Sequence, residues 1–166
     1  MMTQALPKTR LFCDEILSPG GLVSLSHERA HYLVHVMRKR EGDDIALFNA
    51  AQGEWRAVIE SIAKQSVRLR LLECLSLPRA THDMWLAFAL IKNKSELVVE
   101  KATELGVSHI FPVVTQHAVV KHANEAKLRA HAVEAAEQCE RHDVPWLIPY
   151  KNLADFLGAL PAQRLL

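Results

Sequence analysis

The stretch that decides the fold is residues 84–115, MWLAFALIKNKSELVVEKATELGVSHIFPVVT, which has the pattern of a strand, a helix and a second strand. Met84–Ile91 is an unbroken apolar run, typical of a strand buried on both faces, and we expect it to be central in its sheet. Apolar residues then recur along one face of a helix that Gly106 ends. Ile110–Val114 is the second strand, and two strands joined through one helix should be parallel. The sequence therefore predicts an α/β domain.

Composition and charge limit the classes of function. The chain has 166 residues, of which 49% are hydrophobic and 23% charged, as in ordinary globular proteins. We expect no membrane partner and a cytoplasmic location, because no run approaches the roughly 18 apolar residues of a membrane span and the N-terminus lacks an export signal. A net charge of +1 means that a nucleic-acid partner would need a local basic patch. Cys13, Cys74 and Cys139 are widely spaced, which argues against disulfides and zinc.

Residues 1–78 differ from the rest of the chain in their residue pattern, which has short segments, several turn signals and alternating apolar positions. Alternation of this kind is typical of strands with one buried face, and Gln52-Gly53 is placed to turn a hairpin. A helix with an apolar face is expected to run to about Arg40. We therefore expect a small β-rich sheet or barrel carrying one helix, and a domain boundary that separates residues 1–78 from residues 79–166.

After residue 115 the chain continues with alternating helix and strand patterns. A helix is expected over 124–139, a third strand over 146–148 and a third helix over 153–160. Arg164–Leu166 would begin a further strand. Because a three-stranded parallel sheet leaves its edges bare, we expect the chain to be part of a longer protein, truncated at its C-terminus.

Three histidines, His27, His31 and His35, are spaced to line one face of the first helix. The first two could hold a metal ion between them. No acidic residue is spaced to complete such a site, so a partly buried, hydrogen-bonded face is favoured and no metal site is predicted.

Two groups of basic residues are candidates for phosphate contacts. Arg38-Lys39-Arg40 is expected to close the first helix, where the helix dipole alone would favour cations, so a phosphate contact and a plain charge cluster both stay open. Lys92 and Lys94 follow the first strand of the α/β domain, at the carboxyl edge where ligands collect in parallel sheets. That position favours a functional role for both lysines.

A polar stripe is expected on the 124–139 helix. Glu134, Glu137, Gln138 and Arg141 follow helical spacing, which fits a salt-bridged surface or a face turned to a cleft, and spacing alone favours the surface. The sequence contains no phosphate-binding glycine loop, GxSxG elbow or HExxH pair.

Three stretches share their order and spacing with one protein family. They are His31-Tyr32-Leu33, Val36, Arg38, Gly42-Asp43, Phe48 and Gly53; then Lys92, Glu100–Val107 and Pro112; then Glu134–Gln138, Arg141 and Val144-Pro145. Together they resemble the ribosomal RNA small subunit methyltransferase E family, and the KATELGV and EAAEQ elements are quite specific.

The resemblance implies a fold and an activity. The fold is a PUA-like RNA-binding domain followed by a SPOUT-class α/β methyltransferase domain, knotted and homodimeric. The activity is methyl transfer from S-adenosylmethionine to N3 of a uridine in 16S ribosomal RNA of the small subunit. The runner-up is a non-catalytic RNA-binding module, and a third reading is an unrelated α/β protein with a chance match.

The chain departs from the family in two places. The family usually has an arginine soon after the second strand, where this chain has Thr115-Gln116-His117-Ala118. Family members also continue with a GPEGG-type loop and an LGxRILRxETA-type segment, which thread the knot and cradle the cofactor, and this sequence contains neither. We therefore expect the cofactor-binding residues beyond Leu166 and this chain alone to be inactive.

Site roles follow as hypotheses. Transfer to N3 of uridine, a weak acid, requires a base or a positive environment, so Arg141 is the candidate to stabilise developing charge. Glu137 and Gln138 are candidates to relay the proton and hold the base edge. The predicted phosphate contacts, which read no sequence, are Arg38, Lys39, Arg40, Lys92 and Lys94.

Overall fold

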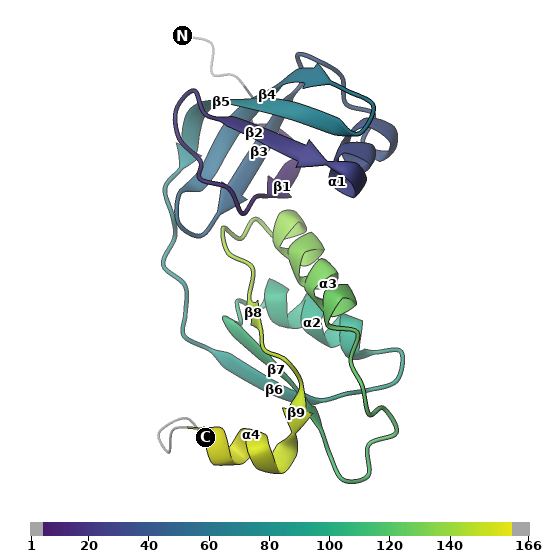
Figure 1. Ribbon diagram of the computed structural model, residues 1–166. Helices are drawn as coiled ribbons and strands as arrows, with labels where there is room; N and C mark the ends of the chain where they lie inside the picture. Colours follow the sequence, from purple (N-terminus) through teal and green to yellow (C-terminus); the bar gives the residue numbers. More distant parts are fainter. Residues whose placement is uncertain (1–4, 161–166) are drawn as a thin grey trace. The chain divides into compact units, whose positions relative to one another are not determined.

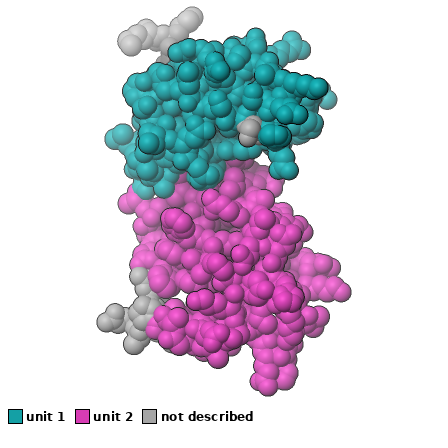
Figure 2. Space-filling view, viewed as in Figure 1, with its two compact units in different colours: residues 1–79 teal, residues 80–166 magenta. Residues whose placement is uncertain are grey.

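The structure is a computed structural model that describes residues 5–160 (Figure 1). The chain forms two compact units, residues 1–79 and residues 80–166 (Figure 2). This division lies beside the boundary expected between residues 78 and 79. None of the helices within the described residues is long and apolar enough to cross a membrane.

The first unit is built on a five-stranded sheet in the order β1-β3-β4-β5-β2. β1 is parallel to β3, and the other pairs are antiparallel. The strands alternate as the sequence predicts: on β5, Val67 and Leu69 are buried, whereas Arg68 and Arg70 are exposed. The strand bounds are Arg10–Phe12 for β1, Leu22–Ser26 for β2, Asp44–Asn49 for β3, Gly53–Ile62 for β4 and Ser66–Ser76 for β5.

The turn between β3 and β4 depends on a glycine. Gly53 has a φ of 77°, and a Cβ added to it would lie 2.2 Å from the carbonyl oxygen of Ser76. A side chain at this position would therefore push β4 away from the end of β5.

The helix of the first unit is shorter than the sequence predicts. α1 (His27–His31) continues into the π-helix η1 (Tyr32–Val36), and Leu33 is fully buried against the sheet. Arg38 then takes a φ of 54°, and the amide of Lys39 donates to the carbonyl of Leu33 at 3.1 Å. This left-handed residue ends the helix, so the prediction that Arg38-Lys39-Arg40 closes it is wrong. The three cations belong to the following loop.

The second unit is a parallel α/β sheet in the order β6-β7-β8, with β9 also paired to β7. α2 and α3 cover one face, where Val99, Ile110 and Leu128 form the core (Figure 1). α4 packs Phe156 against Phe111, which points to the opposite face from its neighbour Ile110. The bounds are Trp85–Ala89 for β6, Ser95–Glu104 for α2, His109–Val114 for β7, Glu125–Gln138 for α3, Trp146–Leu147 for β8, Lys151–Asn152 for β9 and Leu153–Ala159 for α4.

Two details of the second unit differ from the sequence prediction. Within residues 5–160, β6 pairs with β7 alone and lies at the sheet edge, with Ala87 and Ala89 exposed, so the expectation of a central strand is wrong and β7 is the central strand. α3 ends at Gln138, and the left-handed Glu140 (φ 61°) places Arg141 in the following turn rather than on the helix. The strand expected to begin at Arg164–Leu166 lies outside the described residues.

Candidate functional site

The carboxyl edge of the second unit carries the first set of candidate residues. β6 ends at Ala89, and the turn that follows passes through Asn93, which has a φ of 59°. The hydroxyl of Ser95 accepts from the amide of Ile91 at 2.9 Å and donates to its carbonyl at 3.0 Å, which fixes the turn against the start of α2. Lys92 and Lys94 lie exposed in this turn, at the edge where the sequence placed them.

A pocket of about 220 Å³ opens at this edge between the starts of α2 and α3. Lys92, Glu96, His122 and Asn124 are among its lining residues. The side chain of Asn124 caps α3 by accepting from the amide of Lys127 at 3.0 Å. The partial positive charge of two helix starts and the ammonium of Lys92 suit a small anion such as a phosphate group.

One carboxylate opposes that positive field. Glu96 forms an ion pair with Lys127 at 2.6 Å, and this hydrogen bond holds the pKa of Glu96 below its ordinary value. The pair also joins α2 to α3. Glu96 is therefore ionised at neutral pH with its charge largely balanced by Lys127, and the pocket keeps Lys92 as its cation.

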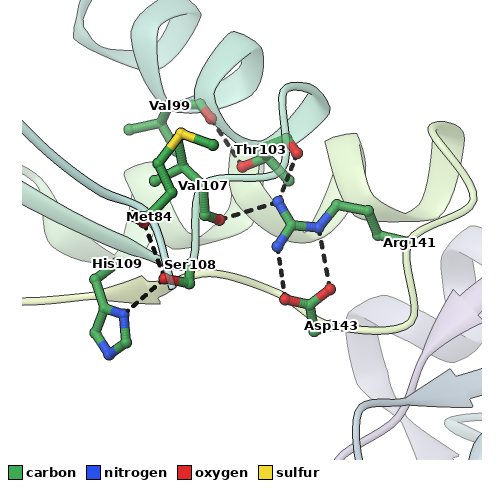
Figure 3. Close-up of polar contacts among 8 residues, drawn as sticks. All are labelled: Met84, Val99, Thr103, Val107, Ser108, His109, Arg141 and Asp143. Carbon is green, nitrogen blue, oxygen red and sulfur yellow. Dashed lines mark hydrogen bonds and ion pairs between the residues drawn. The ribbon is translucent and has the colours of Figure 1, made fainter. Parts of the chain in front are cut away.

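Arg141 lies at the other end of the unit, in a network that Figure 3 shows. Its Nη1 donates to the carbonyls of Thr103 at 2.6 Å and Val107 at 3.0 Å, at the C-terminal end of α2 and the turn beyond it. Its Nε and Nη2 donate to the two oxygens of Asp143 at 3.1 and 2.6 Å. Only 11% of the side chain is exposed. The guanidinium thus adds a donor to the Thr103 carbonyl in the last turn of α2, which also accepts from the amide of Gly106 at 3.1 Å, and a donor to the Val107 carbonyl just beyond the helix.

The same end of the sheet is fixed by two hydroxyl groups. Thr103 donates to the carbonyl of Val99 at 2.8 Å, and Ser108 donates to the carbonyl of Met84 at 2.9 Å (Figure 3). The Ser108 hydroxyl also lies 3.0 Å from Nδ1 of His109. Together with Arg141, these contacts join the end of α2 to the amino-terminal ends of β6 and β7.

The structure does not bring the predicted site residues of the second unit together. Lys92 and Lys94 lie at the carboxyl edge, whereas Glu137, Gln138 and Arg141 lie at the end of α3 and at the amino edge. α3 has 14 residues, so about 21 Å of helix separates its two ends. Glu137 is half-buried, and Gln138 is exposed and donates to Glu134 at 3.4 Å. Neither residue forms a described cluster with the basic edge.

The histidines of the first unit lie along α1 and η1, with the rings of His31 and His35 4.6 Å apart. Among residues 5–160, no three His, Cys, Asp or Glu side chains are arranged to hold a metal ion.

Sequence reasoning missed Asp143 as the partner of Arg141 and His122 as a lining residue of the anion-sized pocket. The i, i+2 spacing of Arg141 and Asp143 just before Val144-Pro145 is the signal that would have indicated the pair.

Two family models match the chain along the division seen in the structure. Residues 78–166 match an RNA methyltransferase domain, and residues 25–72 match the PUA domain of RNA methyltransferases. The chain belongs to the RNA methyltransferase family. The fold class is thereby confirmed as a small PUA-like β-rich domain followed by a SPOUT-type α/β methyltransferase domain.

Curated relatives in this family carry the name that the motifs suggested. Ribosomal RNA small subunit methyltransferase E of Rickettsia conorii is 32% identical over 150 residues, covering 89% of this chain and 62% of the relative. The Bacillus subtilis protein of the same name is 32% identical over 142 residues, covering 81% of this chain and 56% of the relative. The chain thus spans about three fifths of the length of these relatives.

Solved structures of family members agree with the fold. A putative methyltransferase from Legionella pneumophila, in complex with S-adenosylmethionine, superposes with a TM-score of 0.82 at 27% identity, covering 93% of this chain and 67% of that one. Ribosomal RNA small subunit methyltransferase E from Neisseria gonorrhoeae superposes with a TM-score of 0.77 at 22% identity, and the match again covers 93% of this chain and 67% of that one. This second match supports the fold alone.

Proposed function

We propose that this chain is the RNA-binding part and the first portion of the catalytic domain of an S-adenosylmethionine-dependent methyltransferase, which modifies N3 of a uridine in 16S ribosomal RNA. The match of residues 78–166 to an RNA methyltransferase domain carries the proposal. The names of the curated relatives support small-subunit RNA as the substrate. A second copy of the protein is the proposed assembly partner, and the cytoplasm, where ribosomal RNA is handled, is the proposed location.

S-adenosylmethionine would supply an electrophilic methyl group on a sulfonium. Two pockets of the second unit differ in lining and volume. The pocket of about 260 Å³ beside α4 is lined by aromatic and aliphatic side chains, including Trp85 and Phe111, and Lys151 is its one charged lining residue among those described. The pocket at the carboxyl edge is smaller and has no aromatic slot for adenine. Neither pocket fits the whole cofactor.

Residues of this chain support RNA binding more directly than methyl transfer. The pocket at the carboxyl edge offers Lys92 and two helix starts to a phosphate group. Lys94 lies exposed in the same turn, and Arg38, Lys39 and Arg40 lie in the loop after η1. These five side chains are the proposed phosphate contacts.

The roles proposed for the other candidates differ from one another. The bidentate pair with Asp143 balances the charge of Arg141 and turns it toward two backbone carbonyls. We therefore assign Arg141 to holding the end of α2, in preference to stabilising charge on a base. Glu137 and Gln138 stay predicted contacts to the base edge and predicted proton relays, since methyl transfer to N3 requires a group that takes the proton which neutral uridine carries there.

The experiment that tests the proposed function uses the full-length protein with isotope-labelled S-adenosylmethionine and small-subunit RNA. Nucleoside mass spectrometry is expected to reveal 3-methyluridine. A methyl group on another atom or another base would contradict the substrate assignment. RNA binding without any transfer would favour the alternative, a non-catalytic RNA-binding module.

A further inference from the structure

One lining residue of the pocket at the carboxyl edge is held by a side chain from a distant part of the chain. His122 lines this pocket together with Lys92, and it comes two residues before Asn124, which caps α3. Nδ1 of His122 lies 2.9 Å from the hydroxyl of Tyr150, and the two rings meet edge to face with 84° between their planes. This contact joins the loop before α3 to the segment between β8 and β9.

The backbone of Tyr150 is tied to the sheet and to α3. On one side the amide of Ile148 donates to the carbonyl of Ile110 at 2.9 Å, and on the other side β9 pairs with β7. The amide of Tyr150 donates to the carboxylate of Glu125 at 3.2 Å, in the first turn of α3. Tyr150 is half-buried, whereas His122 is exposed. The phenol is therefore the fixed member of the pair, and the imidazole takes its orientation from the phenol.

The same hydrogen bond decides which nitrogen of His122 carries the proton. A neutral imidazole has one N–H and one bare nitrogen, and a partner that donates to one nitrogen places the proton on the other. A phenolic hydroxyl is a stronger acid than a neutral imidazole, so it serves as the donor in such a pair. The hydroxyl of Tyr150 then donates to Nδ1, and Nε2 of His122 carries the proton. His122 thereby offers an N–H group, rather than a lone pair, at the pocket that it lines.

The size and the donors of the pocket indicate its ligand. Pockets that hold small organic molecules measure about 300–1,000 Å³, so a pocket of about 220 Å³ admits a phosphate group but not a whole nucleotide. Lys92 supplies a positive charge and His122 a directed hydrogen bond, and phosphate oxygens in nucleic acids accept from donors of both kinds. Glu96 also lines the pocket, and its ion pair with Lys127 balances its charge. The turn after β6 and the loop before α3 thus each bring one donor to the same small space.

We propose that a phosphate group of the RNA binds in this pocket between Lys92 and Nε2 of His122, and that Tyr150 is the positioning residue that keeps His122 in its donor form. The inference rests on the proposed function, since it names RNA as the source of the phosphate. It goes beyond that function, because neither His122 nor Tyr150 belongs to the five proposed phosphate contacts. Tyr150 acts on binding only through His122.

The first arm of the test reads the tautomer directly by NMR of the 166-residue chain, isotope-labelled at its histidine nitrogens. A bare imidazole nitrogen and one that carries a proton differ widely in chemical shift, and the His122 signals are assigned by their loss in His122→Ala. At about pH 8, where an ordinary imidazole is neutral, Nδ1 of His122 is expected to be bare and Nε2 protonated. Tyr150→Phe keeps the ring and should give a mixture of tautomers. Inorganic phosphate should shift the wild-type His122 signals and leave those of His117, an exposed histidine outside the pocket lining, in place.

The second arm measures affinity for a labelled single-stranded oligouridine by fluorescence anisotropy at low salt. His122→Ala should weaken binding about tenfold, as expected for the loss of a hydrogen bond to a charged group, and Tyr150→Phe about threefold. In a His122→Gln background the side-chain amide supplies an N–H donor that has no tautomer to set, so adding Tyr150→Phe should change nothing further. His117→Ala is the matched control and should bind RNA like the wild type.

The outcomes separate this inference from the proposed function. A bare Nε2 in the wild type, or an equal effect of Tyr150→Phe with and without His122, would show that Tyr150 does not position His122. If the chain binds RNA, but phosphate leaves the His122 signals in place and folded His122→Ala binds like the wild type, the pocket assignment is wrong and the proposed function stands. If phosphate shifts these signals but the chain binds no RNA, the pocket takes a free phosphate. In that case the RNA source of the phosphate and the RNA-binding part of the proposed function both fail. Circular dichroism checks that each variant is folded, and the tautomer and the phosphate titration are read in the wild type.

Discussion

Replacing Arg141 with alanine tests whether this residue holds the fold or acts on the substrate. The change removes four hydrogen bonds, to Thr103, to Val107 and two to Asp143. The carbonyls of Thr103 and Val107 and the carboxylate of Asp143 each lose hydrogen bonds in a region where the Arg141 and Asp143 side chains are 11% and 16% exposed. The Thr103 carbonyl keeps its bond from the amide of Gly106. An unsatisfied buried polar group costs about 1–3 kcal/mol, and water entering the space left by the guanidinium recovers part of this. We expect a loss of about 2–4 kcal/mol in the free energy of unfolding.

The assay is urea and thermal unfolding of the 166-residue chain followed by circular dichroism. For a unit of the size of residues 80–166, 1 kcal/mol corresponds to about 4–8 °C in Tm, so Tm of the second unit should fall by about 10 °C or more. Arg141→Lys keeps the charge but not the fork of donors, and it should recover only part of the loss. Arg79→Ala, which changes an exposed arginine at the end of the first unit, serves as control and should change stability by under about 0.5 kcal/mol.

One result would refute this reasoning. If Arg141→Ala unfolds like the wild type, the contacts to Thr103 and Val107 contribute nothing to stability, and the assignment of Arg141 to holding the end of α2 is wrong. If the full-length variant then stays folded but transfers methyl groups about a hundredfold more slowly, the loss is about 3 kcal/mol of transition-state stabilisation. That outcome would restore Arg141 as a catalytic residue.

Three further predictions concern charge and cofactor. Charge reversal of all five proposed phosphate contacts should weaken RNA binding by orders of magnitude at low salt and flatten its salt dependence, as measured by anisotropy titrations, and an unchanged affinity would place the RNA elsewhere. The 166-residue chain alone should show no saturable binding of S-adenosylmethionine in calorimetry, because neither pocket of the second unit fits the whole cofactor, and tight binding would overturn this. Because the pKa of Glu96 is lowered by Lys127, the Glu96–Lys127 pair stabilises the folded state above the ordinary glutamate pKa of 4.5 and loses that contribution as pH falls below it. Lys127→Ala should remove this part of the acid sensitivity in unfolding experiments, and an unchanged pH profile would mean that the pair contributes nothing.

Local patterns predicted the elements of this fold well. The spacing of apolar residues predicts both the alternation on β5 and the strand–helix–strand stretch at 85–114. This spacing depends only on which face each element buries. The first helix was expected to run to about Arg40, and it ends earlier because Arg38 is left-handed; the left-handed Glu140 likewise takes Arg141 off the helix on which it was expected. Neither residue is a glycine, so no composition signal marks these two changes of backbone direction.

Positions that depend on partners distant in sequence were harder to predict. The unbroken apolar run that contains β6 indicated burial on both faces. Whether a strand is central depends instead on its pairing partners, and within residues 5–160 β6 has one. Helical spacing predicted that Arg141 shares a polar stripe with Glu137. In the structure, the turn at Glu140 places Arg141 against two backbone carbonyls more than thirty positions earlier in the chain. The motif match identified Arg141 as a special position, but motif and spacing could not distinguish a structural role from a chemical one.

The edge position of β6 has a consequence for handling the chain on its own. Its outer backbone amides and carbonyls have no strand partner among residues 5–160, and they border the apolar sequence WLAFA, which contains neither charge nor proline. Edges of this kind recruit a like strand from another molecule, so self-association should rise with concentration, and solubility should limit experiments before stability does. A lysine at the exposed Ala87 would oppose such stacking by charge repulsion without touching the face that packs against α2 and α3.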